Sequence, residues 1–86
     1  MSYCIKIEQE KNTKDSNARF IAKQDEKIVG YVNIKVTLNT QDKEALIEGL
    51  YIEPEYVGQG ISRALMQRAE KWARNNDVKV IHVNEL

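Results

Sequence analysis

The residues that most clearly suggest chemistry are two glycines one position apart, Gly58 and Gly60, in a short loop. An apolar run ends before Pro54, and an apolar helical pattern begins at Ile61. Glycines directly ahead of a helix let a ligand approach the backbone closely, because no Cβ intervenes. The first amides of a helix have no partner within it and lie at the positive end of its dipole. The stretch therefore predicts a strand, a glycine loop and a helix that together seat an anion such as a phosphate group.

Two common phosphate-binding motifs do not fit this loop. It is too short for a P-loop and lacks the Gly-Lys-Ser/Thr ending. Arg63 stands where the third glycine of the dinucleotide-binding fingerprint would be. The alternative to an anion site is an ordinary turn between strand and helix, in which the glycines serve only backbone geometry.

Residues 50–65 resemble motif A of the GNAT superfamily of N-acetyltransferases, a Gln/Arg-x-x-Gly-x-Gly/Ala loop after a strand that ends in Pro. Here the six positions read Glu55-Tyr56-Val57-Gly58-Gln59-Gly60. Both glycines match, and so does the apolar helix start at Ile61 and Leu65. Glu55 departs from the usual Gln or Arg, and Val57 stands where many members carry a basic residue.

The resemblance implies that the chain binds acetyl-CoA or coenzyme A. In the family, backbone groups of the fourth strand pair with the pantetheine amides like an added strand, and the loop amides hold the pyrophosphate. The matching cofactor-binding positions are Leu50, Tyr51, Ile52, Val57, Gly58, Gln59, Gly60, Ile61, Ser62 and Arg63.

The resemblance also implies direct attack of an amine on the thioester. A base must take the ammonium proton, because only the free amine is nucleophilic. Glu48 is the candidate catalytic base by location, since it lies two residues before the cofactor segment. The alternative is a solvated strand carboxylate, and Glu44 and Glu55 are weaker candidates. The tyrosine that protonates the leaving thiolate in many longer members has no counterpart here.

Four strands are predicted ahead of the glycine loop from period-two alternation, at residues 3–9, 18–24, 28–38 and 44–52. Gly30 and Gly49 lie within strands, where glycine indicates a bulge or a close backbone approach. In the resembled family a bulge in the fourth strand opens a slot for the pantetheine arm. Strict alternation puts Ile28 on one face with Ile34 in the third strand. In the fourth it puts Glu48 with Ile52, opposite Ile47 and Tyr51.

A helix is predicted over residues 60–75, with an apolar stripe through Ile61, Leu65, Ala69 and Trp72. Asn75 and Asn76 could supply a left-handed exit. Residues 78–83 are nearly all apolar, which suits a central strand parallel to the fourth and joined to it through the helix. The expected fold class is α+β (mixed α/β), a truncated GNAT-like fold of about five strands in a mixed sheet with one main helix. We expect one domain over residues 1–86.

Three other side chains that could take part in chemistry are expected to have structural roles. Cys4 is more readily a small packing residue than a reactive thiol. Trp72 belongs to the apolar stripe and is expected in the core rather than as a ligand platform. His82, the only histidine, could act as a base but is expected to be structural. No cluster of histidine and cysteine suggests a metal site.

Composition narrows the function classes. The 13 basic and 13 acidic residues balance, so nothing favours nucleic acid as a partner. No apolar run approaches the length of a membrane span or a signal peptide, and the single cysteine excludes an internal disulfide. We therefore expect a cytoplasmic protein without a membrane partner.

The resemblance favours an acetyl-CoA-dependent N-acetyltransferase that acts on an amine of a small molecule or protein. The alternative is a non-catalytic acyl-CoA-binding or interaction module that kept motif A. The short first loop resembles the small YjdJ-type acetyltransferases, although their cysteine after the fifth strand's Lys-Val-Ile is replaced by His82. The helices after the first strand and the elements after the fifth are missing, so a homodimer is predicted to cover Val80, Ile81 and Val83.

Overall fold

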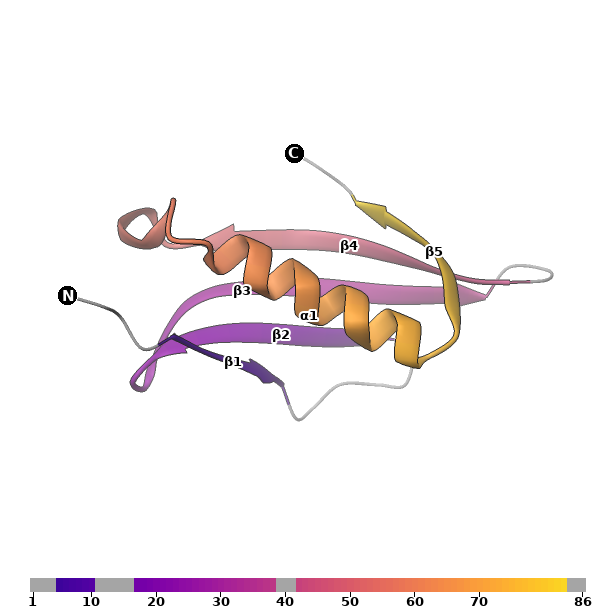
Figure 1. The fold of residues 1–86 in the computed structure, drawn as a ribbon, viewed down its shortest axis with the longest axis horizontal. Helices are drawn as coiled ribbons and strands as arrows, with labels where there is room; N and C mark the ends of the chain where they lie inside the picture. The colour runs from indigo at the N-terminus through magenta and orange to yellow at the C-terminus, as the bar shows by residue number, and fades with distance from the viewer. Residues whose placement is uncertain (1–4, 11–16, 39–41, 84–86) are drawn as a thin grey trace.

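The computed structural model describes residues 5–10, 17–38 and 42–83. A single long helix crosses one face of a five-stranded sheet (Figure 1). The elements are β1 (Ile5–Gln9), β2 (Asn17–Gln24), β3 (Lys27–Leu38), β4 (Lys43–Ile52), the short 3-10 helix η1 (Pro54–Tyr56), α1 (Ile61–Asn75) and β5 (Val78–Val83). The predicted α+β fold, with a five-stranded mixed sheet and one main helix, is confirmed. Tyr3, Cys4 and residues 11–16 of the loop expected over residues 10–17 fall outside the described residues.

The strands lie in the sheet in the same order as in the chain. β1 to β4 pair as antiparallel neighbours, and β5 pairs parallel to β4. α1 makes the crossover that a parallel pair requires. The prediction of a central fifth strand is wrong, because β5 is the last strand at one edge of this sheet.

The core lies between α1 and the face of the sheet that it covers. The helix contributes residues at four-residue spacing, each 4% exposed or less: Ile61, Leu65, Ala69 and Ala73. The strands contribute Phe20, Val32, Ile34 and Ile47, which are almost fully buried. Trp72 is partly buried against this core, as its place on the stripe predicted.

A bulge in β3 reverses the alternation at its start. Ala22 pairs with Gly30 and Lys23 pairs with Ile28, which leaves Val29 as an extra residue. Val29 is fully buried and Ile28 is 48% exposed. The prediction that Ile28 shares the buried face is wrong, because one inserted residue moves every side chain on one side of it to the other face.

A second bulge, in β4, confirms the expectation for Gly49. Asn33 pairs with Glu48 and Tyr31 pairs with Tyr51, so two residues of β4 stand opposite one residue of β3. Gly49 has a φ of 69°, which glycine adopts without strain. The bulge puts Tyr51 on the same face as Glu48, where strict alternation had placed it opposite.

Ile52 is the other residue whose face the bulge changes. It packs against the core with Ile47 and is not on the face of Glu48, so that assignment is also wrong. Gly30 lies against it, since a Cβ there would be 2.7 Å from Ile52 Cδ1 and 2.9 Å from the Tyr51 carbonyl oxygen. The close backbone approach predicted at Gly30 is therefore confirmed.

The end of α1 differs from expectation. The left-handed residue is Asp77, with a φ of 63°, and not Asn75 or Asn76. Asn76 instead donates from its side-chain Nδ2 to the carbonyl of Trp72 at 2.7 Å. The side chain thus satisfies one of the carbonyls that a helix end leaves without a partner.

Candidate functional site

Within the described residues, one edge of β4 has no partner strand along its second half. The pairing with β5 runs from Lys43 opposite Val78 to Ile47 opposite Val83. From Glu48 to the end of β4, no described residue pairs with this edge, and Figure 1 shows β5 directed away from β4 there. Unpaired strand groups of this kind can pair with the amides of an extended ligand.

The glycine loop leads from η1 into α1. Gly58 and Gly60 have φ values of 88° and 80°, a conformation in which other residues are strained. A Cβ built on either glycine would meet no atom within 4 Å. The glycines are therefore needed for backbone shape, and the space beside them is open to a ligand.

The loop and the first turn of α1 carry a row of free amides. The first helical bond runs from the Ala64 amide to the Gly60 carbonyl at 3.1 Å. The amides of residues 58–63 have no acceptor within the described part of the chain. They lie at the positive end of the dipole of a 15-residue helix. The predicted positions from Val57 to Arg63 thus come together here, although Ile61 buries its side chain and presents only its amide.

The turn between β2 and β3 anchors this loop. The Lys27 ammonium lies 3.2 Å from a carboxylate oxygen of Glu53, directly before η1. The hydrogen bond to Glu53 raises the pKa of Lys27 above its ordinary value. The buried Tyr56 donates a hydrogen bond from its hydroxyl to the side-chain carbonyl of Gln24. Sequence reasoning missed these anchors, and the one available signal was an aromatic residue within a short polar loop.

Glu48 differs from the glutamates around it. It is half-buried, lies on the face opposite α1 and directly precedes the bulge. It makes no ion pair or hydrogen bond with any residue that the structure describes. By contrast, Glu8 lies 3.3 Å from Lys23, and Glu44 lies 3.5 Å from His82. An unpaired carboxylate next to an open strand edge is free to accept a proton from a ligand.

The weaker candidates have other surroundings. Glu44 lies in the paired half of β4, opposite Val80 of β5, and is engaged with His82. That contact also supports the structural role expected for the histidine. Glu55 is exposed on η1.

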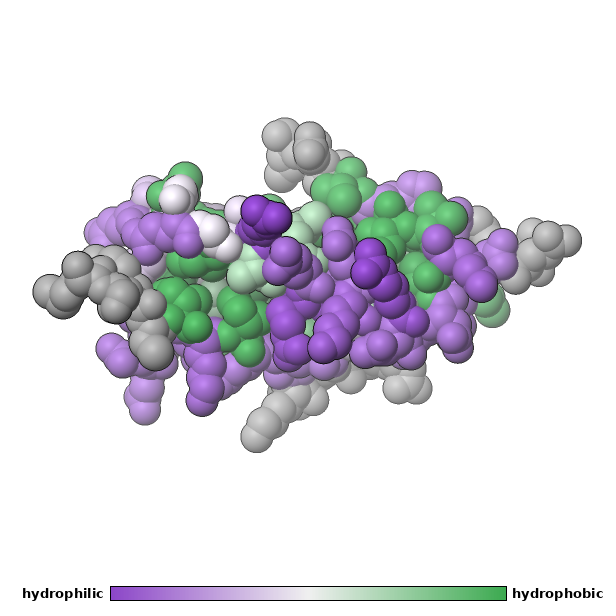
Figure 2. Space-filling view, viewed as in Figure 1, coloured by the Kyte–Doolittle hydropathy of each residue, from purple (hydrophilic) through white to green (hydrophobic). Residues whose placement is uncertain are grey.

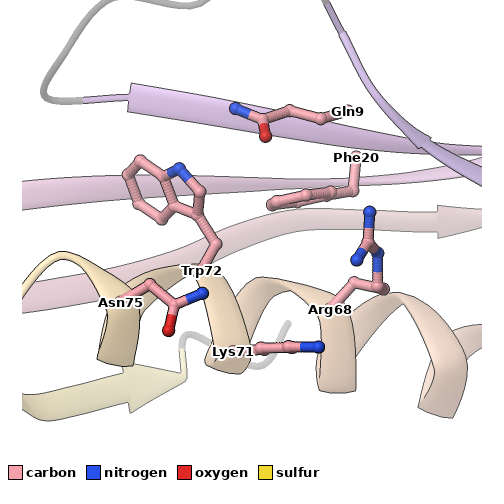
Figure 3. Close-up of a pocket in the computed structure, with 6 residues that line it drawn as sticks. All are labelled: Gln9, Phe20, Arg68, Lys71, Trp72 and Asn75. Carbon is pink, nitrogen blue, oxygen red and sulfur yellow. The ribbon is translucent and has the colours of Figure 1, made fainter.

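Two small pockets flank α1. One, of about 250 Å³, adjoins the glycine loop and is lined by Ile5, Ile7, Gln59, Gly60, Ile61 and Ala64. The other, of about 110 Å³, lies toward the far end of the helix, where Trp72 and Phe20 form apolar walls and Arg68 and Lys71 bring positive charge (Figure 3). Both are smaller than the roughly 300–1,000 Å³ typical of ligand pockets. A ligand too long for these pockets would therefore lie along the strand edge and loop, on the surface.

The fold is that of acetyltransferases. The aminoglycoside N-acetyltransferase AAC(6')-Iy in complex with CoA superposes with a TM-score of 0.86 at 15% identity, over 100% of this chain and 80% of that chain. An aminoglycoside acetyltransferase from an uncultured soil metagenomic sample, in complex with sisomicin, gives 0.86 at 17% identity, over 95% and 78%. A putative acetyl transferase from Pyrococcus furiosus gives 0.76 at 29% identity, over 85% and 51%.

Comparison of the sequence with family profiles identifies one family among the acetyltransferases. The profile of the Acetyltransferase (GNAT) family matches residues 2–85, so the chain belongs to the GNAT family of acetyltransferases. A search of curated proteins found no match. A transcriptional regulator from Bacillus halodurans C-125 shares 25% identity, with a TM-score of 0.80 over 85% of this chain. This chain spans about half the length of that regulator and of the Pyrococcus protein. In the described ranges, no helix has the length and apolar character to cross a membrane.

Proposed function

We propose that the protein is an acetyl-CoA-dependent N-acetyltransferase that acetylates an amine of a small molecule or protein. The observation that supports it most is the open edge of β4 from Glu48 onward, which continues into the free amides of the glycine loop. Family membership gives the reaction class. Two similar structures are named as enzymes that acetylate aminoglycosides, which are amines.

The residues present suit acetyl-CoA as a substrate. Backbone groups of Leu50, Tyr51 and Ile52 lie on the open edge and would pair with the pantetheine amides. The amides of Gly58 to Arg63 would hold the pyrophosphate at the positive end of α1, and Val57, whose amide donates to the Pro54 carbonyl, would border the site. The open space beside Gly58 and Gly60 leaves room for the phosphate oxygens to approach the backbone.

Glu48 would start the reaction by removing a proton from the bound ammonium. The amine nitrogen then forms a bond to the thioester carbonyl carbon, and a backbone N–H of β4 stabilises the oxyanion. Collapse of this intermediate breaks the carbon–sulfur bond, and the nitrogen loses its second proton to water as the amide forms. The coenzyme A thiolate leaves and takes its proton from water, because no tyrosine is assigned that role.

Calorimetry and turnover together test the proposal and its alternative. Acetyl-CoA should bind the purified protein, and thiol release should then be seen with at least one member of a panel of amines. Binding without turnover on any amine would favour the non-catalytic acyl-CoA-binding module. Failure to bind acetyl-CoA would reject both.

We further propose that the protein forms a homodimer through the β5 edge. Val80 and Val83 are 43% and 48% exposed, and Figure 2 shows apolar surface around β5 at the upper right. Exposed apolar edge strands favour pairing with another chain. A location in the cytoplasm and the kinship to YjdJ-type proteins stay predictions.

A further inference from the structure

A second cluster of side chains surrounds the β4 bulge on the face of the sheet opposite α1. Tyr31 of β3 stands opposite Tyr51 of β4, and Asn33 stands opposite Glu48. Residues directly opposite in antiparallel strands share a face, so these four side chains are neighbours. The two tyrosine rings have centroids 5.5 Å apart and are tilted by 31°. We call this cluster the tyrosine patch: Tyr31, Asn33, Glu48 and Tyr51.

The rings of the patch are suited to a cation. The guanidinium carbon of Arg19 already lies 4.3 Å from the centroid of the Tyr31 ring, a cation–π distance. Glu10 offsets that charge, with an oxygen 3.7 Å from Arg19 Nε. Tyr51 is 46% exposed, and no described cation stacks on its ring. The exposed ring of Tyr51 therefore offers a second cation site, directly beside the first.

The bulge joins the patch to the open edge of β4. Gly49 leaves the space that the Asn33 side chain fills, because a Cβ there would lie 2.6 Å from Asn33 Nδ2. The same bulge puts Tyr51 on the face of Glu48. A ligand held on the patch would thus be next to the strand segment assigned to the thioester.

The charges around the patch favour one small cation over a basic protein segment. Glu48 is the carboxylate within the patch, and it has no partner among the described residues. Arg19 and Lys35 lie on the same face. Arg19 pairs with Asn33 and reaches over the Tyr31 ring, and Lys35 follows Asn33 by two residues along β3. A single ammonium group on a short arm can reach Glu48 alone, whereas a lysine-rich segment would also meet these two positive side chains.

We propose that the tyrosine patch binds the acceptor, a small-molecule primary amine that is protonated at neutral pH and carries an aromatic or apolar arm. The ammonium group pairs with Glu48 and lies over Tyr51, and the arm packs on the tyrosine rings. The acceptor role rests on the proposed acetyl transfer, whereas cation binding by the patch does not. Glu48 then both selects the amine by charge and takes its proton.

Binding can be tested without turnover. ¹⁵N-labelled protein is titrated with phenethyltrimethylammonium, which cannot be acetylated, and with the neutral analogue that has a tert-butyl group in its place. The cation should shift the amide signals of the patch and bind several-fold more tightly than the neutral analogue. Equal affinity for the two probes, or shifts elsewhere on the protein, would overturn the proposal.

Substitutions then locate the site. Tyr51→Ala should weaken binding of the cation by about 3- to 30-fold, the range expected for a cation–π contact, whereas Tyr51→Phe should largely retain it. Ile28→Ala is the matched control, since Ile28 is an exposed apolar residue at 48% that pairs outside the patch. Unchanged affinity in Tyr51→Ala would also overturn the proposal.

Kinetics separate this proposal from the proposed function. With phenethylamine and acetyl-CoA, Tyr51→Ala should raise the KM for the amine by a similar factor. The KM for acetyl-CoA should change less, because only the backbone of Tyr51 is assigned to the coenzyme. If the protein fails to bind acetyl-CoA, the proposed acetyl transfer is rejected. The cation titration still tests whether the tyrosine patch binds a cation. If turnover is normal in Tyr51→Ala, or a lysine peptide is the better substrate, the patch assignment falls and acetyl transfer stands.

Discussion

The hydroxyl of Tyr56 donates a hydrogen bond to the side chain of Gln24, which links η1, directly before the glycine loop, to the end of β2. The ion pair between Lys27, at the start of β3, and Glu53, directly before η1, makes a second link nearby. The candidate phosphate-binding loop is therefore fixed in place by contacts with residues that belong neither to β4 nor to α1. Substitutions of Gln24 or Lys27, which flank the turn between β2 and β3, should affect the loop although they lie far from it in sequence.

Tyr56→Phe should lower the free energy of unfolding by about 1 kcal/mol, the usual net value of one hydrogen bond. Urea denaturation followed by circular dichroism measures the change. Tyr51→Phe provides the control, because the Tyr51 side chain is on the surface and should change stability by less than about 0.5 kcal/mol. Equal stability of Tyr56→Phe and the parent would show that the link to Gln24 contributes nothing.

Gly49→Ala should destabilise the protein more than Gly58→Ala. Both positions have positive φ, which costs other residues roughly 1–2 kcal/mol. Only at Gly49 would the new methyl group also meet an atom, Asn33 Nδ2, whereas at Gly58 it would enter open space.

Adding Asn33→Ala to Gly49→Ala should recover the part of the loss that comes from the contact. Chemical denaturation of the two single variants and the double variant gives the comparison. A double variant whose losses simply add would show that the contact with Asn33 is not the cause.

Gly60→Glu should abolish measurable binding of acetyl-CoA, because it places a bulky negative side chain where the pyrophosphate is expected. Calorimetry measures binding after circular dichroism has verified the fold. Gln67→Glu makes a similar change of charge on the exposed surface of α1 and should bind as the parent does. Normal affinity in Gly60→Glu would move the cofactor site away from this loop.

Glu48→Gln should lower kcat by roughly 10²- to 10⁴-fold, the usual contribution of a general base. The affinity for acetyl-CoA should stay the same, because Glu48 precedes the segment assigned to the coenzyme. The dependence of the rate on pH should change as well. Unchanged kinetics would remove Glu48 from the mechanism and leave loss of the proton directly to water.

Sedimentation at micromolar concentration should show a dimer of the 9.9 kDa chain. Val83→Lys, at an exposed position of the β5 edge, should shift the protein toward monomer. Leu38→Lys is the control, since Leu38 is 77% exposed but lies at the end of β3. A parent protein that sediments as a monomer would reject the dimer.

The sequence predicted the elements better than it predicted the faces of the strands. The stripe through Leu65 and Ala69 was readable because α1 buries one side against the sheet. In β3 and β4 the alternation changes at Val29 and Gly49, and apolar pattern alone cannot locate an extra residue in a strand. β5 was expected to be central because its residues are nearly all apolar, but Val78 and Ile81 pack against the core while Val80 and Val83 stay exposed at the edge of the sheet.

The candidate site was predictable to a similar degree. Gly58 and Gly60 could be assigned because their loop is contiguous in sequence with the helix that follows. The ties from Gln24 and Lys27 could not, since they join segments about thirty residues apart through tertiary contacts alone. The pairing of Tyr31 with Tyr51 depends on the register across the bulge, which no local pattern contains.

The agreement between strand order and chain order bears on how the protein folds. Every antiparallel pair from β1 to β4 joins consecutive strands, so each can form as soon as the second strand of the pair is available. Only β5 must wait for α1 to bring it back beside β4. We therefore expect a fast folding reaction in which the meander of β1 to β4 forms first. Docking of α1 and β5 would then complete the fold. The region around the unpaired edge of β4 would therefore be the last part of the sheet to reach its native structure.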